Sequence, residues 1–130
     1  MEPTEGLPKT QRLYRKKEIG SLFEAGKGFN AYPFRVIVYP HKAESQEDAI
    51  PRILVSVSKK RFHHAVKRNK VKRLIRESWR RNKQNLISIC NENNITLDIA
   101  FVYTATCILT YEEIASKMCG ITKRLEGKIC

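Results

Sequence analysis

The segment Lys59–Lys83 reads KKRFHHAVKRNKVKRLIRESWRRNK and holds almost all of the chain's excess charge. It contains twelve Lys or Arg and a single acid, Glu77, which gives it a net charge of +11. The whole 130-residue chain carries +12, from 25 basic and 13 acidic residues, so the remainder is close to neutral at +1. Apolar residues alternate with the cations in this segment, and their spacing decides how it folds.

Helical periodicity over residues 65–86 separates the two kinds of side chain. At about 100° per residue, one arc of the helix is apolar and holds Val71, Leu74, Ile75, Trp79 and Leu86. The residues that fall roughly opposite form what we call the cationic ridge: Asn69, Lys72, Arg73, Arg76, Arg80 and Lys83. We therefore expect the apolar arc, with Trp79 as a core residue, to pack on a sheet while the ridge faces outward.

The ridge has three candidate explanations: a solvated surface, a membrane-binding surface or a surface that binds a polyanion. A simple solvated face normally mixes both signs of charge, whereas here pairs such as Lys72–Arg76 repel each other with Glu77 as the sole nearby acid. A membrane-surface helix would need the apolar side that the sheet occupies. A polyanion relieves the repulsion best, and without zipper heptads or a helical bundle for DNA, an α+β domain of this kind favours RNA.

The rest of the chain predicts one α+β domain over residues 1–130, with 1–12 as a loose arm. Two further helices are expected, at about Lys16–Ala25 and from Thr110, where Thr110 and Glu113 have capping-box spacing. Strands are expected at Pro33–Tyr39, at Arg52–Ser58 and at Leu97–Tyr103. Pro40 is expected to end the first of them. This order predicts a two-layer sandwich of helices packed on a central sheet.

Nothing in the sequence indicates export or a membrane span. The N-terminal MEPTEGLPKTQR lacks the apolar core of a signal peptide. The longest nearly apolar run, Ile99–Leu109, is about half the length that a membrane-spanning helix needs. The cysteines lack the C-x2-C spacing of a zinc site and lie at positions 90, 107, 119 and 130. We expect a cytoplasmic protein with reduced thiols.

No group of residues is arranged for protein-based nuclease chemistry. Paired carboxylates and a His–Glu constellation are both missing from the sequence pattern. His63 and His64 lie beside the basic helix without an acid fixed next to them, so they are expected to be phosphate contacts or turn residues. We expect no catalytic residue and no metal ligand in the chain.

Two segments, SVSKK at 56–60 and AVKRNKVKRLIRES at 65–78, resemble the bacterial ribonuclease P protein subunit. The family's R-N-R core followed by K-R-x-x-R-E reads here as Arg68-Asn69-Lys70, Lys72-Arg73 and Arg76-Glu77. RLYRKKEIGSLFEAGK, PFRVIVY and LTYEEI resemble its N-terminal segment, first core strand and last helix, so the resemblance covers nearly the whole chain. Two positions depart from the pattern: Lys70 lacks the bidentate fork of Arg, and Ile19 stands where some members carry an aromatic residue.

The resemblance implies the protein component of an endoribonuclease that removes the 5′ leader from precursor tRNA. A large catalytic RNA subunit would carry the chemistry with Mg²⁺. Its partners would be that RNA and precursor tRNA, with no membrane and no requirement for a protein oligomer. The family fold implies a mixed sheet in which the basic helix belongs to a left-handed β-α-β crossover, against the usual right-handed rule.

The resemblance also implies two groups of site residues. The expected RNA contacts are Lys59, Lys60, Arg68, Asn69, Lys70, Lys72, Arg73, Arg76 and Arg80. The expected leader cleft, between the first helix and the sheet, would be lined from Ile19, Phe23, Phe34 and Ile37. Phe34 and Ile37 point to opposite faces of their strand, so one of them must be core. The alternative function is a ribosome-associated, structural RNA-binding protein without a catalytic role.

Overall fold

The computed structural model describes residues 12, 13 and 15–129. Along this part of the chain, the elements are α1 (Lys16–Ala25), β1 (Lys27–Ala31), β2 (Phe34–Lys42), a 3₁₀ turn (Gln46–Asp48), β3 (Pro51–Val57), α2 (Ala65–Asn82), α3 (Gln84–Asn93), β4 (Ile95–Tyr103) and α4 (Tyr111–Ile129). The predicted loose arm lies outside the described residues apart from Arg12, which forms an isolated parallel bridge with Ile53 of β3.

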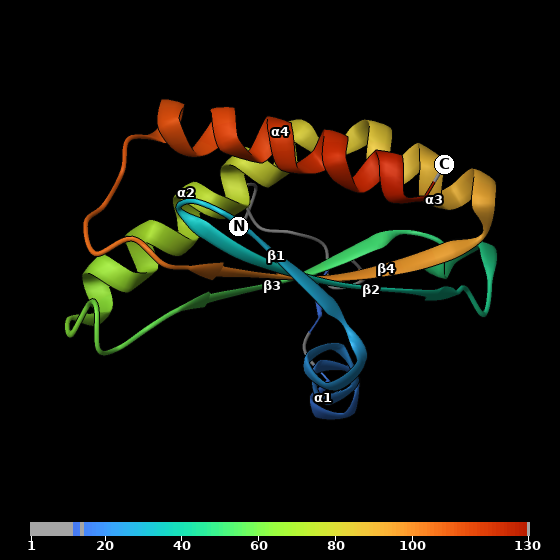
Figure 1. The fold of residues 1–130 in the computed structure, drawn as a ribbon, viewed down its shortest axis with the longest axis horizontal. Coiled ribbons are helices and arrows are strands. Elements are labelled where there is room, and N and C mark those ends of the chain that lie inside the picture. The colour runs from blue at the N-terminus through green and yellow to red at the C-terminus, as the bar shows by residue number, and fades with distance from the viewer. Residues whose placement is uncertain (1–11, 14, 130) are drawn as a thin grey trace.

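The strands form a mixed sheet in the order β1-β2-β4-β3. β2 pairs antiparallel with β1 and β4, whereas β3 runs parallel to β4. α2, α3 and α4 cover one face of this sheet, and α1 lies on the opposite face (Figure 1). The predicted α+β architecture with a mixed sheet is confirmed. The left hand of the crossover from β3 through α2 and α3 to β4 stays a prediction.

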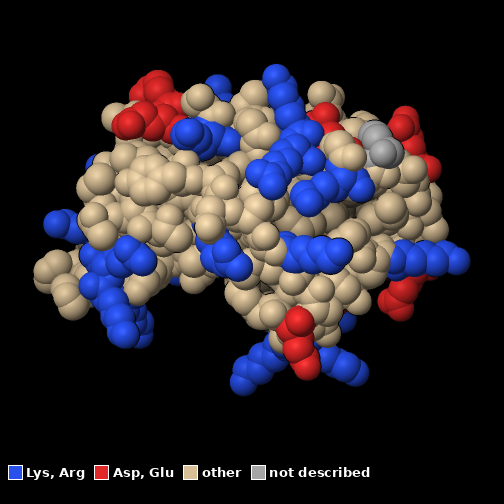
Figure 2. All heavy atoms as spheres, viewed as in Figure 1, with Lys and Arg blue, Asp and Glu red and all other residues tan. Residues whose placement is uncertain are grey.

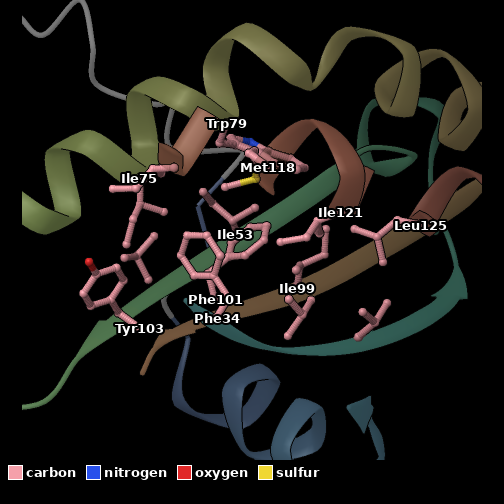
Figure 3. Packing of buried hydrophobic residues seen from close by; sticks show 14 of the residues in the cluster. Phe34, Ile53, Ile75, Trp79, Ile99, Phe101, Tyr103, Met118, Ile121 and Leu125 are labelled. Atoms are coloured by element: carbon pink, nitrogen blue, oxygen red, sulfur yellow. The ribbon is translucent and has the colours of Figure 1, made fainter. Parts of the chain in front are cut away.

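The main core fills the space between the sheet and the three covering helices (Figure 3). The alternating residues of β4 that face the helices are all buried there: Leu97, Ile99, Phe101 and Tyr103. Trp79 of α2 is fully buried with its ring centroid 5.6 Å from that of Phe101, which confirms the prediction that it is core. Its indole Nε1 is a buried donor without a hydrogen-bond partner among the described residues.

The strands differ from the prediction in two places. β1 was missed because KGFNA, with its glycine and asparagine, lacks the alternation of apolar residues that marks a strand. The expectation that Pro40 ends the next strand was wrong, since β2 continues to Lys42 and Pro40 pairs with Leu97. The pairing with β1 reaches along β2 only as far as Val38, which lies opposite Lys27, the first residue of β1. Pro40 therefore lies where β2 has become an edge on that side, and there a missing N–H is tolerated.

The long basic helix is divided in two. α2 ends at Asn82 and α3 begins at Gln84, so the helix expected through Leu86 is interrupted at Lys83. The side chain of Asn82 donates a 2.8 Å hydrogen bond to the carbonyl of Ser78, which is the local competition that asparagine offers to a helix backbone. The predicted capping box of α4 is confirmed by reciprocal bonds of 3.1 and 3.2 Å between Thr110 and Glu113.

Candidate nucleic-acid interface

The turn before α2 is fixed by one of the predicted site residues. Arg68 Nη1 donates hydrogen bonds of 2.8 Å to the carbonyls of both Phe62 and His63. The ring of Phe62 is buried in the core beneath it. Arg68 therefore holds this turn against the helix, and the exposed Lys59 and Lys60 are presented beside the start of α2.

The cationic ridge follows one flank of α2. Its core side is formed by Val71, Ile75, Ser78 and Trp79, which are all buried. Arg73 and Arg80 are exposed on the far side, as are Asn69 and Lys70, whereas Lys72, Arg76 and Lys83 are half-buried along the flank. Helical periodicity predicted that the whole ridge lies opposite the core. The structure shows instead that its half-buried members, Lys72, Arg76 and Lys83, border the core.

The charges of Arg76 and Arg12 locate this flank relative to the sheet. Burial lowers the pKa of Arg76, and repulsion by Arg12 lowers it further. Arg12 is bridged to Ile53 on the outer side of β3, the strand at the edge of the sheet. The ridge thus borders the edge of the sheet at β3, where Arg12 pairs with Ile53 and adds a further cation. Arg12 was not among the predicted site residues because no local pattern in the sequence links it to α2.

Some cations of α2 are paired with Glu77, and others have no acidic partner among the described residues. Its carboxylate accepts hydrogen bonds of 2.9 and 2.7 Å from Arg80 and 3.1 Å from Arg81, and these bonds lower the pKa of Glu77 to about 2. Lys70, Lys72 and Arg73 have no ion-pair partner within the described part of the chain. Burial, and secondarily the charge of Arg80, lowers the pKa of Lys83. This crowding of like charges is unfavourable unless an anion binds.

The opposite side of the molecule has a different character. Figure 2 views the side on which β1 and α4 lie in front, and both Lys or Arg and Asp or Glu side chains are spread over this face. Here Arg124 packs 3.9 Å above the ring of Phe29, so its guanidinium is used in a cation–π contact. This mixture of signs is typical of a solvated surface, in contrast to the ridge.

A second candidate surface lies where α1 crosses the sheet. Leu22 is fully buried, and Ile19 and Ile37 pack partly buried around it. Glu18 is bonded to Arg52 on one side of α1. Phe23 lies five residues on, about 140° around the helix, so it faces the other way. Phe23 is 48% exposed. An aromatic residue that served only to pack α1 on the sheet would be more deeply buried.

The sheet on the Phe23 side of α1 presents a row of partly or fully exposed residues. Arg35, Val102 and Ser56 are register partners across β2, β4 and β3. The next row is Ile37, Ala100 and Leu54, which α1 covers. We refer to Ile19, Phe23, Ile37 and the row Arg35–Val102–Ser56 as the α1–sheet surface.

Phe34 does not belong to this surface, so its assignment to the leader cleft was wrong. It is 1% exposed in the main core, with its ring centroid 5.7 Å from Phe101 and 6.0 Å from Tyr103. Side chains alternate between the two faces along a strand, so residues three apart, such as Phe34 and Ile37, point to opposite faces. Ile37 is therefore the member of the pair that faces α1. The roles of Ile19, Phe23 and Ile37 stay predictions.

Among the described residues, no group of three or more His, Cys, Asp and Glu could hold a metal ion. Burial raises the pKa of the Cys90 thiol to about 12, so this cysteine is a packing residue. Within residues 12–13 and 15–129, no helix has the length and apolar character needed to span a bilayer.

Comparisons with known proteins agree on one family. The family model described as Ribonuclease P matches residues 7–126. The ribonuclease P protein component of Porphyromonas gingivalis is 42% identical over 127 residues, covering 98% of this chain and 91% of the relative. That of Borreliella burgdorferi is 34% identical over 118 residues, covering 90% of this chain and 91% of the relative.

Solved structures give the same fold. A Staphylococcus aureus RNase P protein mutant with defective mRNA degradation activity has a TM-score of 0.67 at 23% identity, covering 91% of this chain and 90% of that one. The RNase P protein of Thermotoga maritima has a TM-score of 0.65 at 24% identity, covering 87% and 96%. These structures establish the fold, and the family match and the sequence relatives together show that this chain belongs to the ribonuclease P protein family.

Proposed function

We propose that this chain is the protein subunit of a cytoplasmic ribonuclease P that removes the 5′ leader from precursor tRNA. The observation that carries the proposal is the cationic ridge: on a helix of a chain from this family, several cations lack an ion-pair partner among the described residues. The ridge binds the catalytic RNA subunit, and the α1–sheet surface binds the leader.

The ridge acts through phosphates. Arg73 and Lys72 have no competing carboxylate among the described residues, so they reach RNA oxygens without breaking an internal ion pair. Arg73 offers the planar fork that suits phosphate. Lys70 contributes a point charge where an arginine would contribute two parallel bonds. Arg68 and the exposed pair Lys59 and Lys60 extend the contact at the start of α2, because Arg68 fixes the turn that carries them.

The α1–sheet surface suits a single-stranded leader. The exposed ring of Phe23 provides a face for base stacking, which is worth about 1–3 kcal/mol per base in single-strand binders. Ile19 and Ile37 supply apolar contact on either side of the helix–sheet junction. Arg35 belongs to the row of sheet residues that the leader would cross, and its guanidinium adds a positive charge there. It donates a 3.1 Å hydrogen bond to Asn30 of β1.

The RNA subunit carries the hydrolysis. Mg²⁺ bound to that RNA would supply an activated water and stabilise developing charge, and no residue of the described chain is assigned to hold it. Two acids near the proposed RNA surfaces already have partners, because Glu77 binds Arg80 and Arg81 and Asp98 binds Arg52. The protein contributes binding and orientation, which raise the effective concentration of correctly placed substrate.

Reconstitution tests this function. The purified protein alone should leave precursor tRNA intact in Mg²⁺, and addition of its cognate RNA subunit should restore cleavage at the mature 5′ end. Robust cleavage by highly purified protein would refute the assignment of chemistry to the RNA. Affinity purification from cells distinguishes the alternative: one large non-ribosomal RNA supports ribonuclease P, whereas ribosomal particles support a structural ribosome-binding role.

A further inference from the structure

A buried charge cluster lies under α1. Asp98 of β4 is 2% exposed on the face of the sheet that α1 covers. Arg52 of β3 binds both of its oxygens, with Nε 2.9 Å from Oδ1 and Nη2 3.2 Å from Oδ2. His41 of β2 lies alongside, with Nε2 3.0 Å from Oδ2. A buried carboxylate requires such compensation, and the bidentate guanidinium provides it.

The same guanidinium also reaches the helix. Arg52 Nη1 donates a 3.1 Å hydrogen bond to Oε2 of Glu18, in the first turn of α1. This bond is not needed to neutralise Asp98, whose two oxygens already have partners. Its structural effect is to join α1 to the sheet at one point on the helix surface.

Few other contacts set the orientation of α1. Leu22 is its one fully buried residue, and Ile19 packs partly buried beside it. Apolar contact is non-directional, so it does not by itself fix the rotation of the helix. The C-terminal end lies close against the sheet at Gly26, where a Cβ would come within 2.9 Å of Ile37 Cγ2. The bond from Arg52 fixes the other end. Because Phe23 lies about 140° from Glu18, rolling of the helix would move its ring relative to the Arg35 row.

We propose that Glu18 and Arg52 are positioning residues, which hold α1 in the rotation that presents Phe23 to the precursor leader. This inference rests on the proposed function of the α1–sheet surface. The two residues contact no substrate. They act through the orientation of the helix, so their loss should weaken discrimination between precursor and mature tRNA while leaving attachment to the RNA subunit unchanged.

The test uses holoenzyme reconstituted with Glu18→Ala protein, since this change spares the Arg52–Asp98 pair in the sheet. Glu24→Ala is the matched control: Glu24 is an exposed acid on the same helix, with no ion-pair partner among the described residues. Both variants remove one negative charge, which by itself favours polyanion binding. The positioning role predicts that Glu18→Ala alone weakens precursor binding in spite of this charge effect. Precursor affinity relative to mature tRNA should fall by at least about threefold.

Two further measurements make the outcome decisive. Glu18→Gln retains an oxygen acceptor for Arg52, so it should lose less discrimination than Glu18→Ala. Amide hydrogen exchange on the free protein should quicken in α1 and stay unchanged in β4. If Phe23→Ala loses discrimination while Glu18→Ala behaves as Glu24→Ala, the positioning role is overturned and the leader surface stands. If Phe23→Ala has no effect, the leader surface fails and the inference fails with it.

Discussion

Removal of a single unpaired cation from the ridge should change the salt dependence of RNA binding by a countable amount. The most direct perturbation is Arg73→Gln, because Arg73 is exposed and has no carboxylate partner in the described chain. Each phosphate that a protein neutralises contributes about 0.7–0.9 to the slope of log affinity against log salt. At about 0.1 M salt one such contact is worth roughly sixfold in affinity, or about 1.1 kcal/mol.

Glu77 provides a variant with the opposite sign. Glu77→Gln removes the negative charge that Arg80 and Arg81 contact, so the net positive charge of α2 increases, and affinity for the RNA subunit and the salt slope should both rise. Arg124→Gln is the matched control, since it removes one charge from α4, where Arg124 packs on Phe29 away from the ridge. Its slope should stay near that of the unmodified protein.

The assay is equilibrium binding of each protein to the cognate RNA subunit, measured at four or more salt concentrations. Circular dichroism should show the same helix content in every variant, which separates charge effects from unfolding. An unchanged slope for Arg73→Gln, or a loss of affinity for Glu77→Gln, would mean that the ridge is not the RNA-binding surface.

Three other predictions concern the core, the leader and acid stability. Trp79→Ala should cost about 3–5 kcal/mol in denaturant unfolding, whereas Trp79→Phe should cost below about 1.5 kcal/mol because it also removes the unpartnered indole N–H; equal costs would contradict this. Phe23→Ala should weaken precursor binding by the holoenzyme about tenfold, with mature tRNA unchanged; equal losses would assign Phe23 to general binding. The pKa of Glu77 is lowered from 4.5 to about 2, so its stabilisation is present above pH 4.5 and disappears as the pH falls toward 2. Glu77→Gln should therefore reduce the acid sensitivity of unfolding in that range by a few tenths of a kcal/mol, since the pair lies at the surface, and an unchanged pH profile would show that the pair adds no stability.

Local patterns predicted those parts of the fold that depend on local sequence. The first helix was predicted at Lys16–Ala25, the bounds that α1 has, and the Thr110–Glu113 spacing predicted the start of α4. The apolar arc of the basic segment placed Trp79 in the core. In each case the signal and the structure lie within a few residues of one another, so no tertiary information was needed.

The features that were missed depend on contacts distant in sequence. Strand alternation shows that Phe34 and Ile37 point to opposite faces of the sheet, but it does not show which face the three helices cover. Phe34 points to the helix-covered face and is therefore core. The division of the basic helix at Lys83 follows from the side chain of Asn82 competing for one carbonyl, without a glycine or proline to announce it. Arg52 and Asp98 are 46 residues apart, and their pairing requires the parallel register of β3 and β4.

The two proposed RNA surfaces meet at β3. On one side, Arg12 is bridged to this strand and lies close enough to Arg76 to lower its pKa, so it connects the strand with the ridge. On the other side, Arg52 of the same strand holds Glu18 and hence the rotation of α1. β3 is paired along its length with β4, which is buried on both faces, so it forms a rigid connection between the two surfaces. A rigid link would keep the distance between the proposed RNA-subunit site and the proposed leader site constant, and fixed placement of a substrate is itself a contribution to the rate of a reaction.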